Sequence, residues 1–208
     1  MARSVVCVSH TTGSGGDEVA KRAAEQLGFL YVEEEIIAGA AAEGGVDPRE
    51  VADEERRKSL ATRMLAAFAT GGGDTFTTHG GVRLTPEQLR SGEIRALIRE
   101  TIVQTAARGD VVILAHAASY AVDRGPQTLR VLVTASPAVR TRRIAAAEGV
   151  DEAQAARMVK DSDAGRSDYL DRFYSVHREE PTDYDLVVST DTLSSEQVAE
   201  IVVQAAGL

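Results

Sequence analysis

The residues best suited to chemistry lie near the start of this sequence, where a glycine-rich turn follows an apolar run. Residues 4–8 read SVVCV and residues 13–16 read GSGG. A turn of this kind between a buried strand and a helix can direct backbone N–H groups and the helix dipole at an anion. Glycines also let the backbone approach such a ligand closely. The segment therefore predicts a phosphate-binding loop, with these candidate contacts: His10, Thr12, Gly13, Ser14, Gly15, Gly16 and Asp17.

Two side chains of a standard P-loop are absent from this turn. The standard loop carries a lysine for the β- and γ-phosphates and a serine or threonine for Mg²⁺. When the glycines are aligned, Gly16 stands at the lysine position and Asp17 at the hydroxyl position. An acidic side chain repels phosphate unless Mg²⁺ lies between them, so Asp17 is the candidate metal ligand. A tight turn that binds no ligand remains an alternative.

Strand-like and helix-like segments alternate along the chain. This order predicts one α/β domain over residues 1–208, with a doubly wound, mostly parallel sheet. The expected strands cover 4–8, 30–32, 110–114, 129–134 and 186–189, and the expected helices cover 17–27, 33–43, 47–69, 85–107, a segment after 136–137, 151–163, 165–174 and 194–206. Ligands of such sheets bind beyond the carboxyl ends of the strands, which is where residues 9–16 are expected.

One segment interrupts this alternation. Residues 70–84 contain three consecutive glycines and then two more, with threonine, aspartate and histidine between them. This composition favours a mobile loop. A tolerated surface insertion and a flap that closes over a ligand are both consistent with it.

Composition limits the classes of partner. The chain has 23 Lys and Arg against 32 Asp and Glu, a formal net charge of −9, which argues against nucleic acid but not against a nucleotide. The single cysteine, Cys7, lies in an apolar run and is expected to be a core residue. No apolar run reaches 18 residues and no signal-peptide pattern is seen, so we expect a cytoplasmic protein without a membrane partner.

Several segments together resemble one family. The GSGG turn followed by Asp17-Glu18-Val19-Ala20 is similar to the cytidylate kinase-like family, whose loop reads GSGG rather than GxGK. Residues 30–37 (LYVEEEII) resemble its second strand and the helix that follows. Asp163-x-x-Arg166 with Tyr169 resembles its lid element, and residues 184–191 (YDLVVSTD) resemble its closing strand. The likeness extends over nearly the whole chain in the expected order.

The resemblance implies a P-loop nucleoside monophosphate kinase-like fold with a short lid. The acceptor-binding insertion would cover about residues 33–92 and the lid about residues 136–178. The implied activity is transfer of the γ-phosphoryl group of ATP, with Mg²⁺, to CMP or a similar small acceptor. The candidate catalytic residues of the lid are Arg166, Asp163, Arg143 and Arg140, and the candidate acceptor-binding residues are Glu33, Arg95, Arg99 and His116. For each basic residue, a solvated helix surface or pairing with a surface carboxylate is the alternative.

Two departures from the family pattern affect the fixed charge of the site. The family has an arginine where His10 stands and another where His116 stands. Arginine is always charged and can bind phosphate in a bidentate manner, whereas histidine is mostly neutral at pH 7. Two hypotheses therefore stay open: a kinase in which another cation replaces the lysine, and a non-catalytic nucleotide-binding or regulatory protein on a kinase scaffold. Alanine-rich helix faces permit a homodimer and do not require one.

Overall fold

The computed structural model describes residues 3–33, 45, 76–77, 83–84, 86–115 and 117–207, with side chains in 3–33, 95–115 and 117–207. The predicted helix at 33–43 apart from its first residue, the predicted helix at 47–69, the candidate His116 and most of the predicted loop at 70–84 lie outside these residues. Within 70–84, the short strands β3 (Phe76–Thr77) and β4 (Arg83–Leu84) pair in antiparallel fashion.

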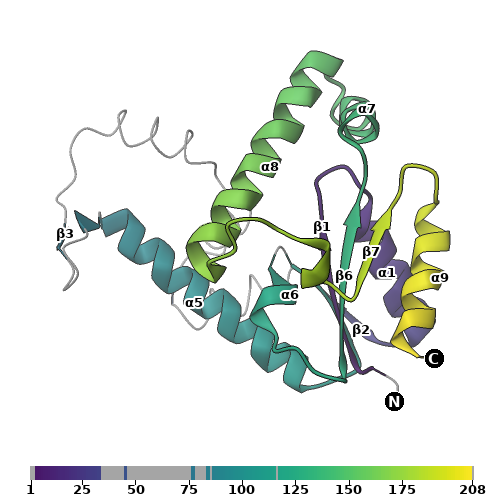
Figure 1. Cartoon of the computed structure of the whole chain (residues 1–208), viewed down its shortest axis with the longest axis horizontal. Helices are drawn as coiled ribbons and strands as arrows, with labels where there is room; N and C mark the ends of the chain where they lie inside the picture. Colours follow the sequence, from purple (N-terminus) through teal and green to yellow (C-terminus); the bar gives the residue numbers. More distant parts are fainter. Residues whose placement is uncertain are drawn as a thin grey trace.

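A five-stranded parallel sheet forms the centre of the molecule (Figure 1). Its order is β2-β5-β1-β6-β7, and every neighbouring pair is parallel. The strands are β1 (Val5–His10), β2 (Leu30–Val32), β5 (Val111–Leu114), β6 (Thr128–Thr134) and β7 (Leu186–Ser189). The chain places β2 and β5 on one side of β1 and then crosses to β6 and β7, so a crevice is expected at the carboxyl end of β1. The α/β class and the parallel sheet are confirmed.

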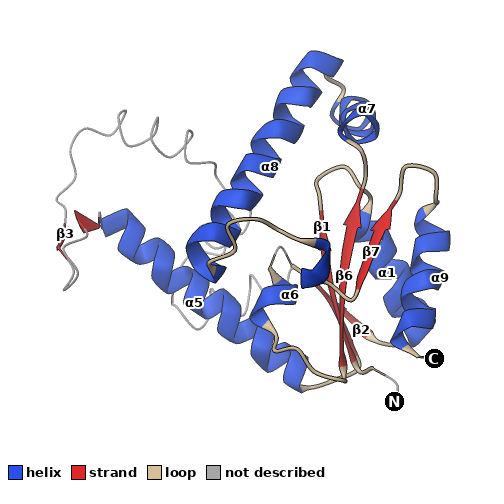
Figure 2. Cartoon of the chain, viewed as in Figure 1, coloured by secondary structure: helices blue, strands red, loops and turns tan. Residues whose placement is uncertain are grey.

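Helices cover both faces of this sheet (Figure 2). Helices α1 (Gly16–Leu27) and α9 (Ser195–Ala206) pack on one face, and α5 (Pro86–Ala107) and α6 (Ala118–Ala121) pack on the other. The division follows the alternation of strand side chains. Val6 and Val8 of β1 belong to the first cluster, while Val5 and Cys7 belong to the second. The short α6 was not predicted from the sequence.

Helices α7 (Pro137–Glu148) and α8 (Glu152–Tyr174) extend beyond the carboxyl ends of the strands (Figure 1). Side chains cap both helices at their first turns. Ser136 accepts the Val139 N–H at 3.4 Å, and Asp151 accepts the Gln154 N–H at 2.7 Å. Both helices therefore begin at defined residues, and together they form the region predicted as the lid.

One prediction about this region was wrong. Separate helices were expected at 151–163 and 165–174, yet α8 runs unbroken through a buried Gly165. A glycine inside a helix costs about 1 kcal/mol relative to alanine. Packing of Ala155 and Val159 against Ile144 of α7, together with the buried Leu170 further along, outweighs that cost.

The chain after α8 forms a single 3₁₀ turn, η1 (Pro181–Asp183), which was not predicted, before it enters β7. In the described part of the chain, no helix combines the length and apolar character needed to cross a membrane.

Candidate phosphate-binding site

Residues 11–15 join β1 to α1 at the carboxyl edge of the sheet. Gly13 and Gly15 have φ values of 80° and 76°, in the left-handed region that favours glycine. The Thr11 N–H donates to the Val133 carbonyl at 3.1 Å, and the Ser14 hydroxyl donates to the same carbonyl at 3.1 Å. Ser14 is fully buried. The structure thus places its side chain beneath the loop, holding the loop against β6.

Gly16, at the aligned lysine position, lies directly against His10. A Cβ atom built on Gly16 would be 2.3 Å from His10 Cβ and 2.7 Å from His10 Cγ. Carbon atoms cannot approach so closely without a shift. The histidine side chain therefore occupies the space where a larger residue at position 16 would begin. Its placement gives a physical reason for the glycine that alignment alone does not supply.

Arg140 joins helices α7 and α8 to the loop. Its side chain is 4 % exposed and binds Asp163 of α8 through two hydrogen bonds, of 2.8 and 2.5 Å. The same guanidinium donates to the Thr12 carbonyl at 3.3 Å. The Thr12 hydroxyl is 2.6 Å from the Ser162 hydroxyl of α8. The tip of the loop is thus in contact with both helices.

Arg166 of α8 lies deeper, with its side chain 5 % exposed. It binds both carboxylate oxygens of Glu179, through Nε at 2.7 Å and through Nη2. It also donates to the Tyr184 hydroxyl at 2.9 Å and to the His10 carbonyl at 3.4 Å. Burial opposes the charge on Arg166, but the hydrogen bond and the charge of Glu179 outweigh burial and raise its pKa. Arg166 is therefore a buried cation with a carboxylate partner.

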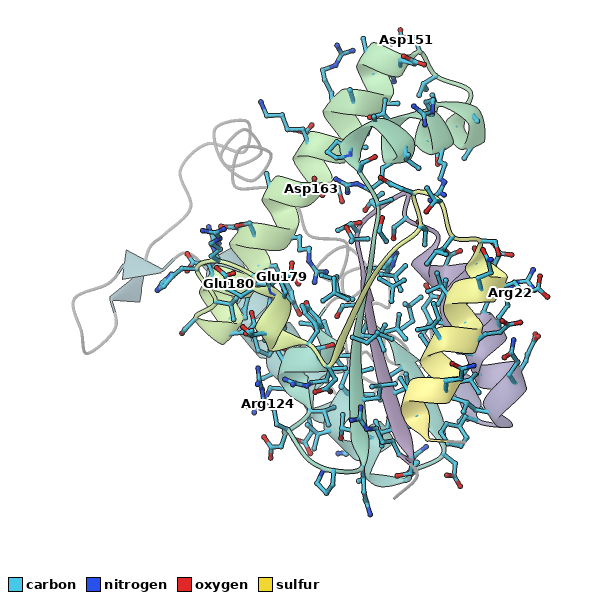
Figure 3. The ribbon with its side chains drawn as sticks, turned by 45° about the vertical axis from the view of Figure 1, so that its right-hand side comes forward. Arg22, Arg124, Asp151, Asp163, Glu179 and Glu180 are labelled. Carbon is cyan, nitrogen blue, oxygen red and sulfur yellow. The ribbon has the colours of Figure 1, made fainter. Side chains whose placement is uncertain are left out.

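A cavity of about 340 Å³ opens among these groups. Figure 3 labels Asp163 on α8 and Glu179 near the lower end of this helix. Three of the four predicted catalytic residues, Arg140, Asp163 and Arg166, meet at this cavity. Its lining comprises Thr11, Thr134, Ala135, Pro137, Arg140, Asp163, Arg166, Ser167, Leu170, Val176 and Glu179.

Sequence reasoning missed two residues that bind Arg166, namely Tyr184 and Glu179. Tyr184 lies in the YDLVVSTD segment that carried part of the family resemblance, and its position there could have marked it. Glu179 had no comparable signal, because it stands among other charged residues in an irregular stretch. Its importance is seen only in the folded structure, where it contacts Arg166 and the Tyr184 hydroxyl.

Arg143, the fourth predicted catalytic residue, points to the other side of the loop. It donates to the Ser14 carbonyl at 3.3 Å, to the Thr190 hydroxyl at 2.9 Å and to the Thr190 carbonyl at 2.7 Å. It therefore ties the loop to the segment after β7. It also lines a second cavity of about 430 Å³, whose other lining residues are Gly15, Glu18, Arg22, Leu193, Ser194, Ser195 and Glu196.

Asp17, the candidate metal ligand, is exposed in the first turn of α1. In the part of the chain that the structure describes, no group of three or more His, Cys, Asp or Glu side chains could hold a metal. Mg²⁺ in nucleotide sites is commonly bound by one or two carboxylates together with the substrate phosphates. Asp17 fits that role as a single protein ligand, with the nucleotide supplying the other oxygens.

The described acceptor-side candidates are not gathered in one place. Glu33 follows β2 and accepts the Tyr31 hydroxyl at 2.5 Å. The guanidinium of Arg95 lies 3.4 Å from the centroid of the Phe173 ring, and burial lowers its pKa to about 10. Arg99, one turn further along α5, lines a separate cavity of about 580 Å³ beside Val5 and Thr128, at the amino edge of the sheet. Arg95 and Arg99, both predicted to bind the acceptor, therefore lie in different surroundings.

Comparison with known proteins identifies the family of the chain. The model of the cytidylate kinase-like family matches residues 5–192. A cytidylate kinase from Methanocorpusculum labreanum is 26% identical over 198 residues, which cover 95% of this chain and 93% of that protein.

Solved structures show the same fold. An uncharacterized protein from Eubacterium ventriosum has a TM-score of 0.66 and 16% identity, with 97% of each chain covered. A shikimate kinase from Bacteroides thetaiotaomicron has a TM-score of 0.53 and 14% identity, with 98% of each chain covered. These likenesses concern the fold, whereas the family model spans the glycine loop as well as helices α7 and α8. The chain belongs to the cytidylate kinase-like family.

Proposed function

We propose that this protein is a kinase that uses ATP and Mg²⁺ to phosphorylate a nucleoside monophosphate such as CMP, or a similar small acceptor. The observation that carries the proposal is the convergence of two lid arginines, Arg140 and Arg166, on a cavity beside the glycine loop. Phosphoryl transfer depends mainly on positioning and on stabilisation of charge on the transferred group. Buried guanidinium groups next to a phosphate-binding loop are suited to that task.

The residues divide into two roles under this proposal. The helix start at Gly16 and Asp17 would hold the nucleotide phosphates, and the Asp17 carboxylate would hold Mg²⁺, which would supply positive charge to offset that of the phosphates. Arg140 and Arg166 bind the oxygens of the transferred phosphoryl group. With Gly16 in place of a lysine, the positive charge at the transferred group comes from the lid side of the cavity.

A specific observation favours the non-catalytic alternative. Both lid arginines already bind carboxylates, Arg140 with Asp163 and Arg166 with Glu179. In addition, the His10 side chain fills the space over Gly16. A protein that binds a nucleotide as a signal does not have to stabilise a transition state. Arginines that are largely neutralised by carboxylates are therefore sufficient for it.

The test combines calorimetric titration of ATP, CMP and AMP, with and without Mg²⁺, with a coupled assay of phosphoryl transfer. For a kinase, Arg166→Ala should lower turnover by about 10²–10³-fold and change ATP affinity far less. Arg172→Ala is the matched control, because Arg172 lies on the same helix and pairs with Asp168 at 2.9 Å. It should retain turnover. Binding by the wild type without turnover would favour the non-catalytic alternative, and no binding of any nucleotide would exclude both.

A further inference from the structure

Glu179 occupies the position beside Arg166 that an anionic ligand group would take. The carboxylate faces the Nε–Nη2 edge of the guanidinium and binds it in a bidentate manner. Phosphate oxygens use the same edge with the same geometry. Since Arg166 and Glu179 both line the 340 Å³ cavity, a phosphoryl group entering it meets a guanidinium whose preferred edge is already in use.

The two partners differ in how firmly the fold holds them. Arg166 belongs to the long helix α8, and its position is supported by the Tyr184 hydroxyl and the His10 carbonyl as well as by Glu179. Glu179 accepts a hydrogen bond from the same Tyr184 hydroxyl, but its backbone lies outside any helix or strand, in the short connection between the end of α8 at Tyr174 and η1. The neighbouring side chains Arg178 and Glu180 project into solvent, 85 % and 49 % exposed, and pair with each other at 3.1 Å.

Withdrawal of Glu179 would break its bonds with Arg166 and with the Tyr184 hydroxyl, but its exposed neighbours Arg178 and Glu180 would let the side chain turn outward without repacking α8. Arg166 would then keep its contacts with Tyr184 and the His10 carbonyl, and it would offer the released edge to a new anion. A buried guanidinium left without any anionic partner would be costly, so the exchange requires an incoming anion. This pairing therefore favours ligands that deliver oxyanion oxygens directly to Arg166.

We propose that Glu179 is a positioning residue for Arg166. Its carboxylate takes the place of the ligand's phosphoryl group and is displaced when a phosphoryl group binds. This inference rests on the proposed function for the identity of the natural ligand, but it concerns the binding of an oxyanion and not its transfer. A ligand must therefore bind Arg166 more favourably than Glu179 does in order to replace it.

The experiment measures the affinity of inorganic pyrophosphate by calorimetry for the wild type, Glu179→Gln, Arg166→Ala and the double variant. Glu179→Gln should bind pyrophosphate about tenfold more tightly, since a charged competitor for the same hydrogen bonds has been removed. The gain should be absent when Arg166 is alanine. Glu180→Gln is the matched control, because it removes the same charge from the next residue, whose side chain is exposed. It should change the affinity less than twofold.

Glu179→Asp gives a second test if Glu179→Gln does not fold, because it keeps the charge but shortens the side chain. It should give a smaller gain that also depends on Arg166. An unchanged or weaker affinity in folded Glu179→Gln would overturn the inference, and so would an equal gain in the Arg166→Ala background. An Arg166-dependent gain in a protein that transfers no phosphoryl group would support the inference and count against the kinase proposal.

Discussion

At the scale of single residues, the loop is shaped by one close contact. Gly16 is the first residue of α1, and it does not have the positive φ of Gly13 and Gly15. Backbone conformation is therefore not the reason for a glycine here. The reason is the His10 side chain, which lies within 3 Å of the position that a Cβ would take. The absence of a lysine at position 16 and the histidine at position 10 are thus linked by one packing contact.

A methyl group at position 16 should expose this dependence. Gly16→Ala should lower the free energy of unfolding by about 1–3 kcal/mol, because His10 or the loop must shift to make room. Chemical denaturation measures the change. In a His10→Gly background the same substitution should cost much less, since the clashing atoms are gone. An equal loss in both backgrounds would show that contact with His10 is not the cause.

At the scale of elements, ion pairs join strands and helices that lie far apart in the sequence. Arg130 of β6 is buried and binds Asp185, which precedes β7, through Nη2 at 3.2 Å and through its own backbone N–H at 2.9 Å. The Asp185 backbone N–H donates to the Arg130 carbonyl at 2.9 Å. These contacts set the register between the two strands at their amino ends.

The Asp185 contacts should make stability depend on pH in the acidic range. Burial opposes ionisation of Asp185, but the hydrogen bonds from Arg130 outweigh it and lower its pKa. A carboxyl group with a lowered folded-state pKa stabilises the protein above its unfolded pKa of about 3.9, and this contribution disappears as the pH falls through the folded-state value.

Asp185→Asn should therefore be less stable than the wild type by a constant amount from pH 7 to pH 5, and the difference should shrink below about pH 4. Urea denaturation at pH 7, 5, 4 and 3 measures it. Asp123→Asn, at an exposed position, is the control and should show a smaller difference at pH 7. A difference that grows at low pH would contradict the assignment.

At the scale of the whole molecule, the single cysteine of the chain reports on global opening. Cys7 lies on β1, the central strand of the sheet, and is fully buried between layers of helices. Burial raises the pKa of its thiol to about 12, so both the thiolate form and reagent access are suppressed in the folded protein.

A thiol reagent such as DTNB should therefore modify the folded protein at pH 8 at least about 10³-fold more slowly than the chemically unfolded chain. The rate should rise with denaturant in parallel with global unfolding, as followed by circular dichroism. Rapid modification of the native protein would mean that the sheet opens locally at β1. Nucleotide that binds the folded state should slow the reaction further.

Local signals in the sequence placed most of the described elements within a residue or two. β7 was predicted with its observed bounds, because an apolar run between charged residues and a helix cap is readable without tertiary information. The helix break expected at residue 164 was wrong. Gly165 lowers the local helix propensity, but packing of α8 against α7 outweighs this effect. The glycine-rich turn between β1 and α1 could be located from the sequence, because glycines supply the positive φ values that such a turn requires.

The sequence by itself determined the fold class, the position of the glycine loop and the family, since these depend on periodicity and on short motifs. Only the tertiary structure decided which cations reach the cavity and what neutralises them. Arg166 meets Glu179 and the His10 carbonyl, whereas Arg143 turns to Thr190 and Arg99 lines another cavity. The physical reason is that spacing along a helix determines which side chains share a face. It does not determine which partners the folded chain brings to that face.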